Sequence, residues 1–146
     1  MIGTEPVVVV RKVTASPDRV FKAWTDPKAL VEWFVTAQNQ QVAEANMDLQ
    51  EGGTYKITIT DPEDKFVAFG VFQRIDPPRL LEFTWQWEES SIEKGVSLVT
   101  IELKPLDDGT ELTLTHAKLE SAKSVQAHTL GWTSILGRLE TFISQS

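Results

Sequence analysis

The C-terminal part of the chain carries one long helical pattern. Residues 121–143 contain no proline, and their apolar or imidazole side chains recur at steps of three or four. This period is typical of an amphipathic helix that buries one stripe of side chains. At about 1.5 Å per residue the helix would be roughly 30 Å long, which is enough to cross a β-sheet. The stripe consists of Val125, His128, Trp132, Leu136, Leu139 and Ile143.

Two glycines interrupt this helical pattern. Gly131 and Gly137 both lie inside the predicted helix, where each costs about 1 kcal/mol relative to alanine. We therefore expect a neighbouring backbone or ring to approach the helix closely at these two positions.

Most of the chain before this helix alternates between apolar and polar residues. A period of two is typical of strands that bury one face. Turn-forming residues separate the runs, among them Gly52-Gly53 and residues 107–109, and short turns join antiparallel neighbours. Residues 88–95 read as a polar loop. The predicted strands are residues 7–13, 43–49, 55–59, 66–75, 81–87, 97–103 and 112–116.

Two short helices are predicted between the first and second strands. Ser16-Pro17 and Asp26-Pro27 each combine an N-cap residue with a proline suited to the first helical turn. Apolar residues follow at helical spacing as far as Phe34, and polar residues from Gln38 end the pair. The order is thus a strand, two helices, about six strands and a long helix. It predicts a single α+β domain over residues 1–146, with an antiparallel sheet of about six to seven strands covered by the C-terminal helix.

The composition narrows the classes of function. Lys and Arg number 14 against 21 Asp and Glu, a net charge of −7, which disfavours a nucleic-acid partner because phosphate binding requires clustered cations. The absence of cysteine excludes disulfides, thiolate nucleophiles and cysteine metal sites. The first residues show no basic region and no apolar run long enough for a signal or a membrane span. We expect a cytoplasmic protein without a membrane partner.

Short motifs along nearly the whole chain resemble a known family. No single motif is specific, but together they resemble the heat-shock protein 90 ATPase activator-like proteins of the START-like (SRPBCC), helix-grip superfamily. The motifs are Ala15-Ser16-Pro17, residues 20–27, Trp33-Phe34, Asp48-Leu49, residues 52–55, Gly70, residues 76–85, residues 99–101, residues 109–116, His128, Gly131-Trp132 and Leu139.

This resemblance implies a curved antiparallel sheet that grips the C-terminal helix around a hydrophobic cavity. It implies less about function, because one fold hosts many functions. The family's namesake is a two-domain co-chaperone, and only its second domain looks like this chain. Some relatives in the wider superfamily bind lipids, hormones or polyketides.

The aromatic residues predict where a ligand would bind. Alternation places Trp85 and Trp87 on one face of the sheet, and the helical stripe places Trp132 opposite them. Binding pockets are mainly apolar with few polar groups, so these rings favour a lined pocket, with a well-filled core as the alternative. We expect a hydrophobic or aromatic small molecule, and no cofactor, in contact with Trp33, Phe69, Val71, Trp85, Trp87, His116, His128, Trp132 and Leu136.

The signals for catalysis and metal binding are weak. His116 and His128 are candidates for an acid and base pair, or for two structural histidines with satisfied hydrogen bonds. No HxH or HExxH spacing supports a metal site. The carboxylate pairs Glu88-Glu89 and Asp107-Asp108 fall in predicted loops and indicate solvated surface.

Three hypotheses about function remain open at this point. The first is a small-molecule binding module, motivated by the facing aromatic residues. The second, implied by the resemblance, is a chaperone-regulating protein-interaction module that stimulates the heat-shock protein 90 ATPase. The third is a cofactor-free cyclase or hydrolase that uses His116 and His128. Since no catalytic constellation is identified, we do not expect an enzyme. The oligomeric state is not indicated.

Overall fold

A computed structural model describes residues 5–88 and 95–145. Within these ranges the strands form one antiparallel sheet in the order β1-β7-β6-β5-β4-β3-β2, which confirms the predicted α+β fold. Most of the predicted polar loop, residues 89–94, lies outside the described residues. The elements are β1 (Val7–Val13), α1 (Pro17–Thr25), α2 (Pro27–Leu30), β2 (Gln41–Met47), β3 (Thr54–Thr60), β4 (Lys65–Asp76), β5 (Leu80–Trp87), β6 (Ser97–Leu106), β7 (Gly109–Ala117) and α3 (Ala122–Ser144).

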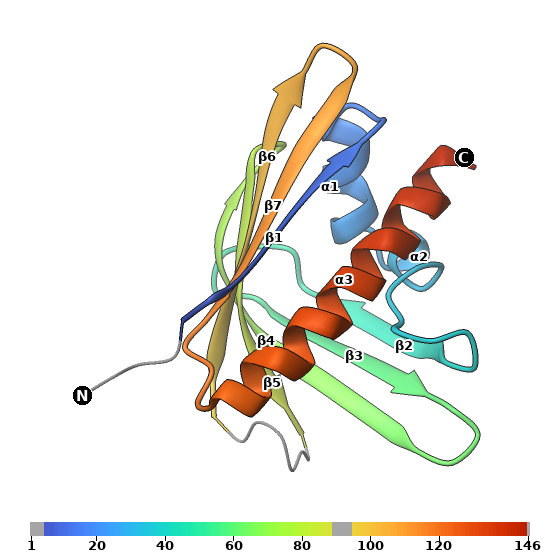
Figure 1. Cartoon of the computed structure of the whole chain (residues 1–146), viewed down its shortest axis with the longest axis vertical. Helices are drawn as coiled ribbons and strands as arrows, with labels where there is room; N and C mark the ends of the chain where they lie inside the picture. Colours follow the sequence, from blue (N-terminus) through green and yellow to red (C-terminus); the bar gives the residue numbers. More distant parts are fainter. Residues whose placement is uncertain (1–4, 89–94, 146) are drawn as a thin grey trace.

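The long helix α3 crosses the inside of the curved sheet (Figure 1). The C-terminal half of α3 lies near α1, and α3 also contacts the edge strand β1. The Oγ of Ser121 caps the helix by accepting the backbone N–H of Ser124 at 3.0 Å. This arrangement confirms both the predicted helix and its place against the sheet. Its buried side chains are Ser124, His128, Trp132, Ile135, Leu136, Leu139 and Ile143.

The two glycines of α3 do not make the close approaches that we expected. A Cβ atom at Gly131 would lie 3.7 Å from Cγ2 of Thr36, and one at Gly137 would lie 3.6 Å from Nη2 of Arg11. Both distances are ordinary van der Waals contacts with the ends of side chains. Neither backbone nor ring packing therefore requires glycine at these positions.

The region after α1 differs from the prediction in length. The capping signals are confirmed, because Asp26 accepts the backbone N–H of Lys28 at 3.0 Å to begin α2. However, α2 ends at Leu30, and turns carry the chain onward to place Trp33 and Phe34 in the core, each 1% exposed. Of the second predicted helix, only the first turn forms.

A β-bulge in β2 changes which of its side chains face inward. The pairing with β3 shifts register between Val42 and Glu44, so that Val42 pairs with Ile59 and Ala45 with Ile57. A bulge adds one residue to one strand and reverses the alternation beyond it. The predicted alternation, which grouped Ala43 with Ala45, is therefore wrong at this point. Leu49, which the same alternation placed inward, lies beyond the strand and is 43% exposed.

Regular pairing between β4 and β5 is interrupted at Gly70. A Cβ atom there would lie 2.0 Å from the carbonyl oxygen of Thr84. The Oη of Tyr55 donates to this same oxygen at 2.6 Å, and the backbone N–H of Val71 donates to Oγ1 of Thr84 at 2.8 Å. Side chains thus satisfy backbone groups that the ladder leaves unpaired, as buried polar groups require. Glycine is needed here because the two backbones touch.

Candidate ligand pocket

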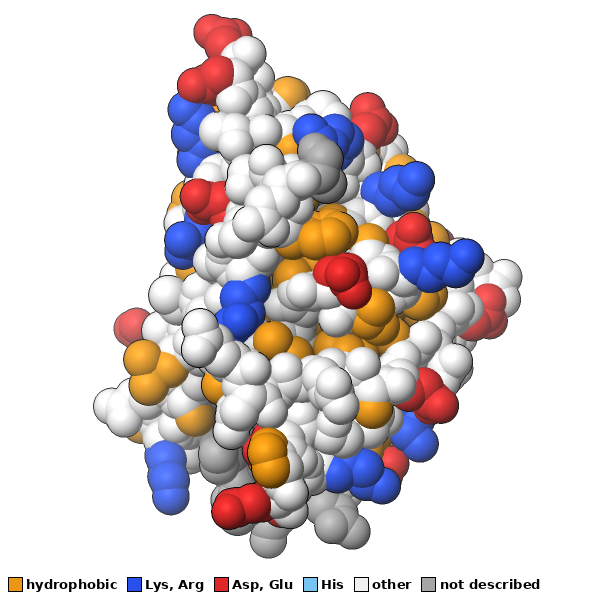
Figure 2. Space-filling view, turned by 90° about the vertical axis from the view of Figure 1, so that its right-hand side faces the viewer, with side chains coloured by type: hydrophobic (Ala, Val, Ile, Leu, Met, Phe, Trp, Pro, Cys, Tyr) orange, Lys and Arg blue, Asp and Glu red, His pale blue; other side chains and the backbone are white. Residues whose placement is uncertain are grey.

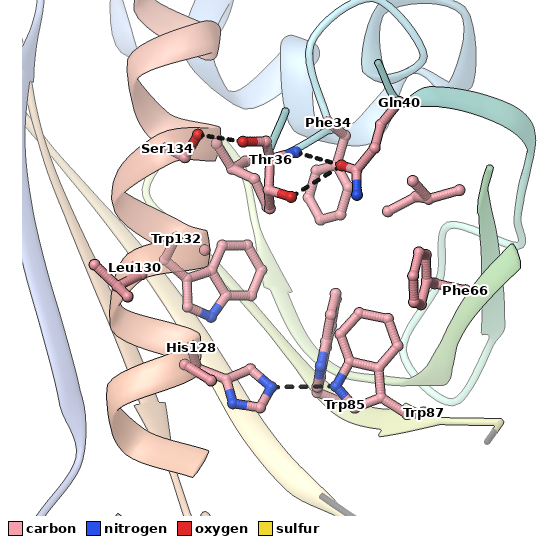
Figure 3. A pocket seen from close by; sticks show the side chains of 14 residues that line it. Phe34, Thr36, Gln40, Phe66, Trp85, Trp87, His128, Leu130, Trp132 and Ser134 are labelled. Atoms are coloured by element: carbon pink, nitrogen blue, oxygen red, sulfur yellow. Dashed lines mark hydrogen bonds between the residues drawn. The ribbon is translucent and has the colours of Figure 1, made fainter. Parts of the chain in front are cut away.

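A pocket of about 570 Å³ lies between the first half of α3, the chain after Phe34, and strands β3 to β5. Figure 3 shows the lining side chains converging on it from these separate elements. On the face seen in Figure 2, apolar side chains gather in a central hollow. The lining residues are Phe34, Thr36, Gln40, Ile59, Phe66, Trp85, Trp87, Ala127, His128, Leu130, Gly131, Trp132, Ser134 and Ile135.

Four of the nine residues predicted to contact a ligand line this pocket. They are Trp85 and Trp87 from β5 and His128 and Trp132 from α3, which the two periodicities had placed opposite one another. Three further predicted residues lie behind the wall as core, each no more than 1% exposed. They are Trp33, His116 and Leu136.

The last two predicted residues, Phe69 and Val71, lie on the other face of β4. Phe69 pairs with Lys56 and Gln86, whereas the pocket-lining Phe66 pairs with the pocket-lining Ile59. Since successive residues of a strand point to opposite faces, Phe69 and Val71 point away from α3. The prediction placed both residues on the wrong face of the strand.

The correct face was available from the turn between β3 and β4. Oδ1 of Asp61 accepts the backbone N–H groups of Glu63 and Asp64 at 2.8 and 2.7 Å, which closes a tight turn. The register then places Phe66 opposite Ile59. Because the position of the turn sets the register of a hairpin, this signal could have identified Phe66. Thr36 and Gln40 come from a segment with no periodicity, and nothing in the pattern indicated them.

His128 joins α3 to the end of β5 at one end of the pocket. The indole N–H of Trp87 donates to its Nε2 at 3.1 Å (Figure 3). An indole nitrogen only donates, so this Nε2 accepts, and the ring proton is on Nδ1. Nδ1 donates to the carbonyl oxygen of Ser124 at 2.8 Å, with Oγ of Ser124 at 3.2 Å. These contacts define a neutral imidazole in one tautomer.

His116 has the opposite tautomer in the layer behind. Its Nδ1 accepts the indole N–H of Trp132 at 2.9 Å, so its Nε2 carries the proton and donates to Oγ of Ser97 at 2.6 Å. The Ser97 hydroxyl donates in turn to the carbonyl oxygen of Trp85 at 3.1 Å. Burial, with a smaller contribution from nearby His128, lowers the pKa of His116 to about 3. The imidazole is therefore neutral at physiological pH.

The two imidazoles lie together, with ring centroids 4.8 Å apart. Both nitrogens of each ring make hydrogen bonds, to indoles on one side and to serine groups on the other. An acid and base pair needs a nitrogen that reaches substrate. The geometry of His116 and His128 therefore supports the structural interpretation over the catalytic one.

The polar end of the pocket lies opposite His128. Oε1 of Gln40 accepts both the backbone N–H and the Oγ1 hydroxyl of Thr36, each at 2.9 Å. Oγ of Ser134 donates to the carbonyl oxygen of Thr36 at 2.8 Å, which ties this segment to α3. Of the described residues that line the pocket, none is Asp, Glu, Lys or Arg. Across residues 5–88 and 95–145, no group of three His, Asp or Glu side chains is placed to hold a metal ion.

The sheet, the helix and the pocket between them define a START-like, helix-grip domain. Residues 14–144 match the sequence profile of the family described as Activator of Hsp90 ATPase homolog 1-like protein. The chain belongs to this family. No curated protein sequence matches it.

Solved structures agree with this assignment. CalU16 from Micromonospora echinospora is 31% identical, with a TM-score of 0.73 over 95% of this chain and 76% of that one. A protein from Chromobacterium violaceum is 24% identical, with a TM-score of 0.83 over 94% and 95% of the two chains. An AHSA1-like protein from Aeromonas hydrophila is 19% identical, with a TM-score of 0.81 over 96% and 92%. The last two comparisons show the fold alone.

No helix in the described parts of the chain is long and apolar enough to cross a bilayer.

Proposed function

We propose that this chain is a binding module for an apolar small molecule, held between α3 and the sheet. The observation that carries the proposal is the pocket itself, at about 570 Å³ and walled by aromatic rings. Small-molecule sites are typically about 300–1,000 Å³ and mainly apolar, with few polar groups. Both features match this pocket.

The aromatic wall is held in place from behind. Trp85 packs against Trp87 at 5.2 Å between ring centroids and against Trp132 at 5.1 Å. Trp87 and Trp132 are each fixed by an indole hydrogen bond to a histidine. A wall that is already ordered loses little side-chain entropy when a ligand arrives, which favours binding.

The pocket is also open to an entering molecule. Leu130 lines it from α3 and is 74% exposed, and Phe66 lines it from β4 and is 36% exposed. Contact of two large apolar side chains with water is unfavourable, and a bound ligand would cover part of their surface. They support entry of the ligand between the helix and the end of the β3–β4 hairpin.

Thermal unfolding with a panel of apolar and aromatic compounds tests the proposal. A ligand that binds the folded state alone raises Tm as its concentration rises. Ala127 lines the pocket and its neighbour Gln126 is exposed, so Ala127→Phe should abolish the shift and Gln126→Phe should keep it. Compounds that never shift Tm, or that shift both variants equally, would argue against a ligand in this pocket.

Membership of the family favours a second proposal, regulation of the heat-shock protein 90 ATPase. This role would use an exposed surface and not the pocket. The measurement is the ATPase rate of the chaperone with and without added protein. A rate that rises equally with the wild type and Ala127→Phe would support the second role, and an unchanged rate would contradict it.

A further inference from the structure

We infer that the pocket selects an uncharged aromatic molecule whose hydrogen-bond acceptor meets the side-chain amide of Gln40. This inference rests on the proposed function, because it names the chemistry of the ligand in the same pocket. It depends on three properties of the lining: its charge, its rings and the unused donor at its polar end.

The charge of the lining excludes ions. None of the 14 described residues around the pocket is acidic or basic, and His128 is neutral by its hydrogen bonds. A charged ligand would lose its hydration without gaining a counter-ion, which is costly. The net charge of −7 further disfavours an anion. Carboxylates such as fatty acids are thus poor candidates.

The rings of the lining favour a flat aromatic ligand. Phe34, Trp85 and Trp132 contact one another in tilted or edge-to-face pairs, and Trp87 stands edge-to-face to Trp85 at 88°. Aromatic rings prefer offset or edge-to-face partners over face-to-face stacking, and such pairs add stability beyond the area that they bury. A ligand ring entering among them would extend the same packing.

The polar end of the pocket presents one unused donor. A backbone N–H can only donate, so the Gln40 atom that faces the N–H of Thr36 must be the oxygen, Oε1. Oε1 also accepts the Thr36 hydroxyl, which leaves both hydrogens of Nε2 without a protein acceptor among residues 5–88 and 95–145. Figure 3 shows Nε2 of Gln40 turned toward the space that the rings enclose.

The opposite end of the pocket offers no exposed donor of this kind. The N–H of Trp87 is already donated to Nε2 of His128, and Nδ1 of His128 is bonded to Ser124. The indole N–H of Trp85 also has no partner among the described residues, but its nitrogen is buried. Gln40 therefore offers the donor that a ligand reaches without displacing a ring, and the ligand acceptor should lie at that end. A ketone, ester, ether or phenol oxygen on an aromatic ring fits this requirement.

Four naphthalene probes test the inference through quenching of tryptophan fluorescence at pH 7. 2-Acetylnaphthalene carries an acceptor, and 2-ethylnaphthalene has nearly the same shape without one. 2-Naphthoate and 2-naphthylmethylammonium carry the two charges. The charged probes should bind at least about tenfold more weakly than 2-ethylnaphthalene, because the lining offers no counter-ion.

Two variants of Gln40 test whether its side-chain amide binds the ligand acceptor. Gln40→Glu keeps an oxygen for Thr36 but replaces the donor by an acceptor, and Gln40→Met removes the amide. The affinity ratio of acetyl to ethyl probe should fall about fivefold in both variants, as for one lost hydrogen bond. Gln38→Glu adds the same charge to the same segment at an exposed residue outside the lining, and should leave the ratio unchanged.

The outcomes separate the inference from the function on which it rests. Probes that bind with an unchanged ratio in the Gln40 variants, or a charged probe that binds most tightly, would overturn the inference and leave the binding function standing. If no probe binds the wild type, both fail. The comparison of the four probes uses the wild-type protein alone. It can therefore contradict the inference even if a variant folds poorly.

Discussion

The indole N–H of Trp132, in the middle of α3, donates to Nδ1 of His116 on β7 at 2.9 Å. Both residues are buried, at 2% and 0% exposed. The bond fixes the rotation of the helix over the sheet and the tautomer of the histidine at once. It therefore holds in place a ring that lines the pocket.

Loss of this bond should be costly, and another tryptophan provides the control. Trp132→Phe leaves Nδ1 of His116 buried without its donor, which typically costs about 1–3 kcal/mol beyond the lost volume. Trp24 is similarly buried, at 4% exposed, and its Nε1 has no partner in the described structure. Trp24→Phe loses similar volume but no hydrogen bond. Urea unfolding of the two variants should show the larger loss for Trp132→Phe, and equal losses would contradict the role of the bond.

Stability should depend on pH through His116. Its pKa is lowered from 6.5 to about 3 by burial, so between these values the unfolded chain binds a proton that the folded protein does not. The stability that neutral His116 provides to the folded protein is fully present above pH 6.5. It is lost as pH falls towards 3, at about 1 kcal/mol per pH unit. Urea unfolding at pH 7, 5.5 and 4.5 measures this slope.

The variant His116→Asn should be less stable than the wild type at pH 7, and this difference should shrink as pH falls because the slope is flatter. Asparagine can accept from Trp132 but does not titrate. The carboxylates are common to both proteins, so the difference between the two slopes reports the titration of His116 together with its coupling to His128. Parallel slopes would show that protonation of another group controls the acid response.

The two helical glycines should respond differently to alanine. Both Gly131→Ala and Gly137→Ala add a methyl group at ordinary contact distance, and each should stabilise the protein by about 0.5–1 kcal/mol through helix propensity. Only Gly131 lines the pocket. Gly131→Ala should therefore weaken binding of 2-ethylnaphthalene, whereas Gly137→Ala should leave the affinity unchanged. Unfolding and fluorescence titration on the same samples separate the two effects, and equal affinities would place the ligand elsewhere.

Alanine should destabilise the protein at two other glycines, Gly70 in the sheet and Gly52 in a turn. Gly70→Ala forces a Cβ atom against the carbonyl oxygen of Thr84, which stands at 2.0 Å, and should cost more than about 3 kcal/mol. Gly52 has φ of +86° but nothing within 4 Å of its Cβ position. Gly52→Ala should cost only about 1–2 kcal/mol for its left-handed backbone. Denaturation midpoints rank the two, and a tolerated Gly70→Ala would mean that β4 and β5 can separate there.

Periodicity predicted the elements well because it reports which side of each element is buried. The stripe through His128 and Trp132 located α3, and the alternation through Trp85 and Trp87 located β5 with its inward face. Phe69 and Val71 were assigned wrongly because an apolar residue on the outer face of a strand looks the same in sequence as one on the inner face. At β2, the bulge after Val42 changed the alternation without any signal in the pattern.

The sequence by itself determined the order of the elements, the family and four of the six aromatic or imidazole rings that line the pocket. The elements and the facing rings follow from local period and capping, which depend on near neighbours alone. The tertiary structure decided the polar chemistry of the pocket. The amide of Gln40 comes from an irregular segment, and its orientation is set by Thr36, which Ser134 of α3 holds in turn. The tautomers of His116 and His128 depend on indoles 16 and 41 residues away in sequence. Hydrogen bonds between distant residues carry no period, so folding alone brings these groups together.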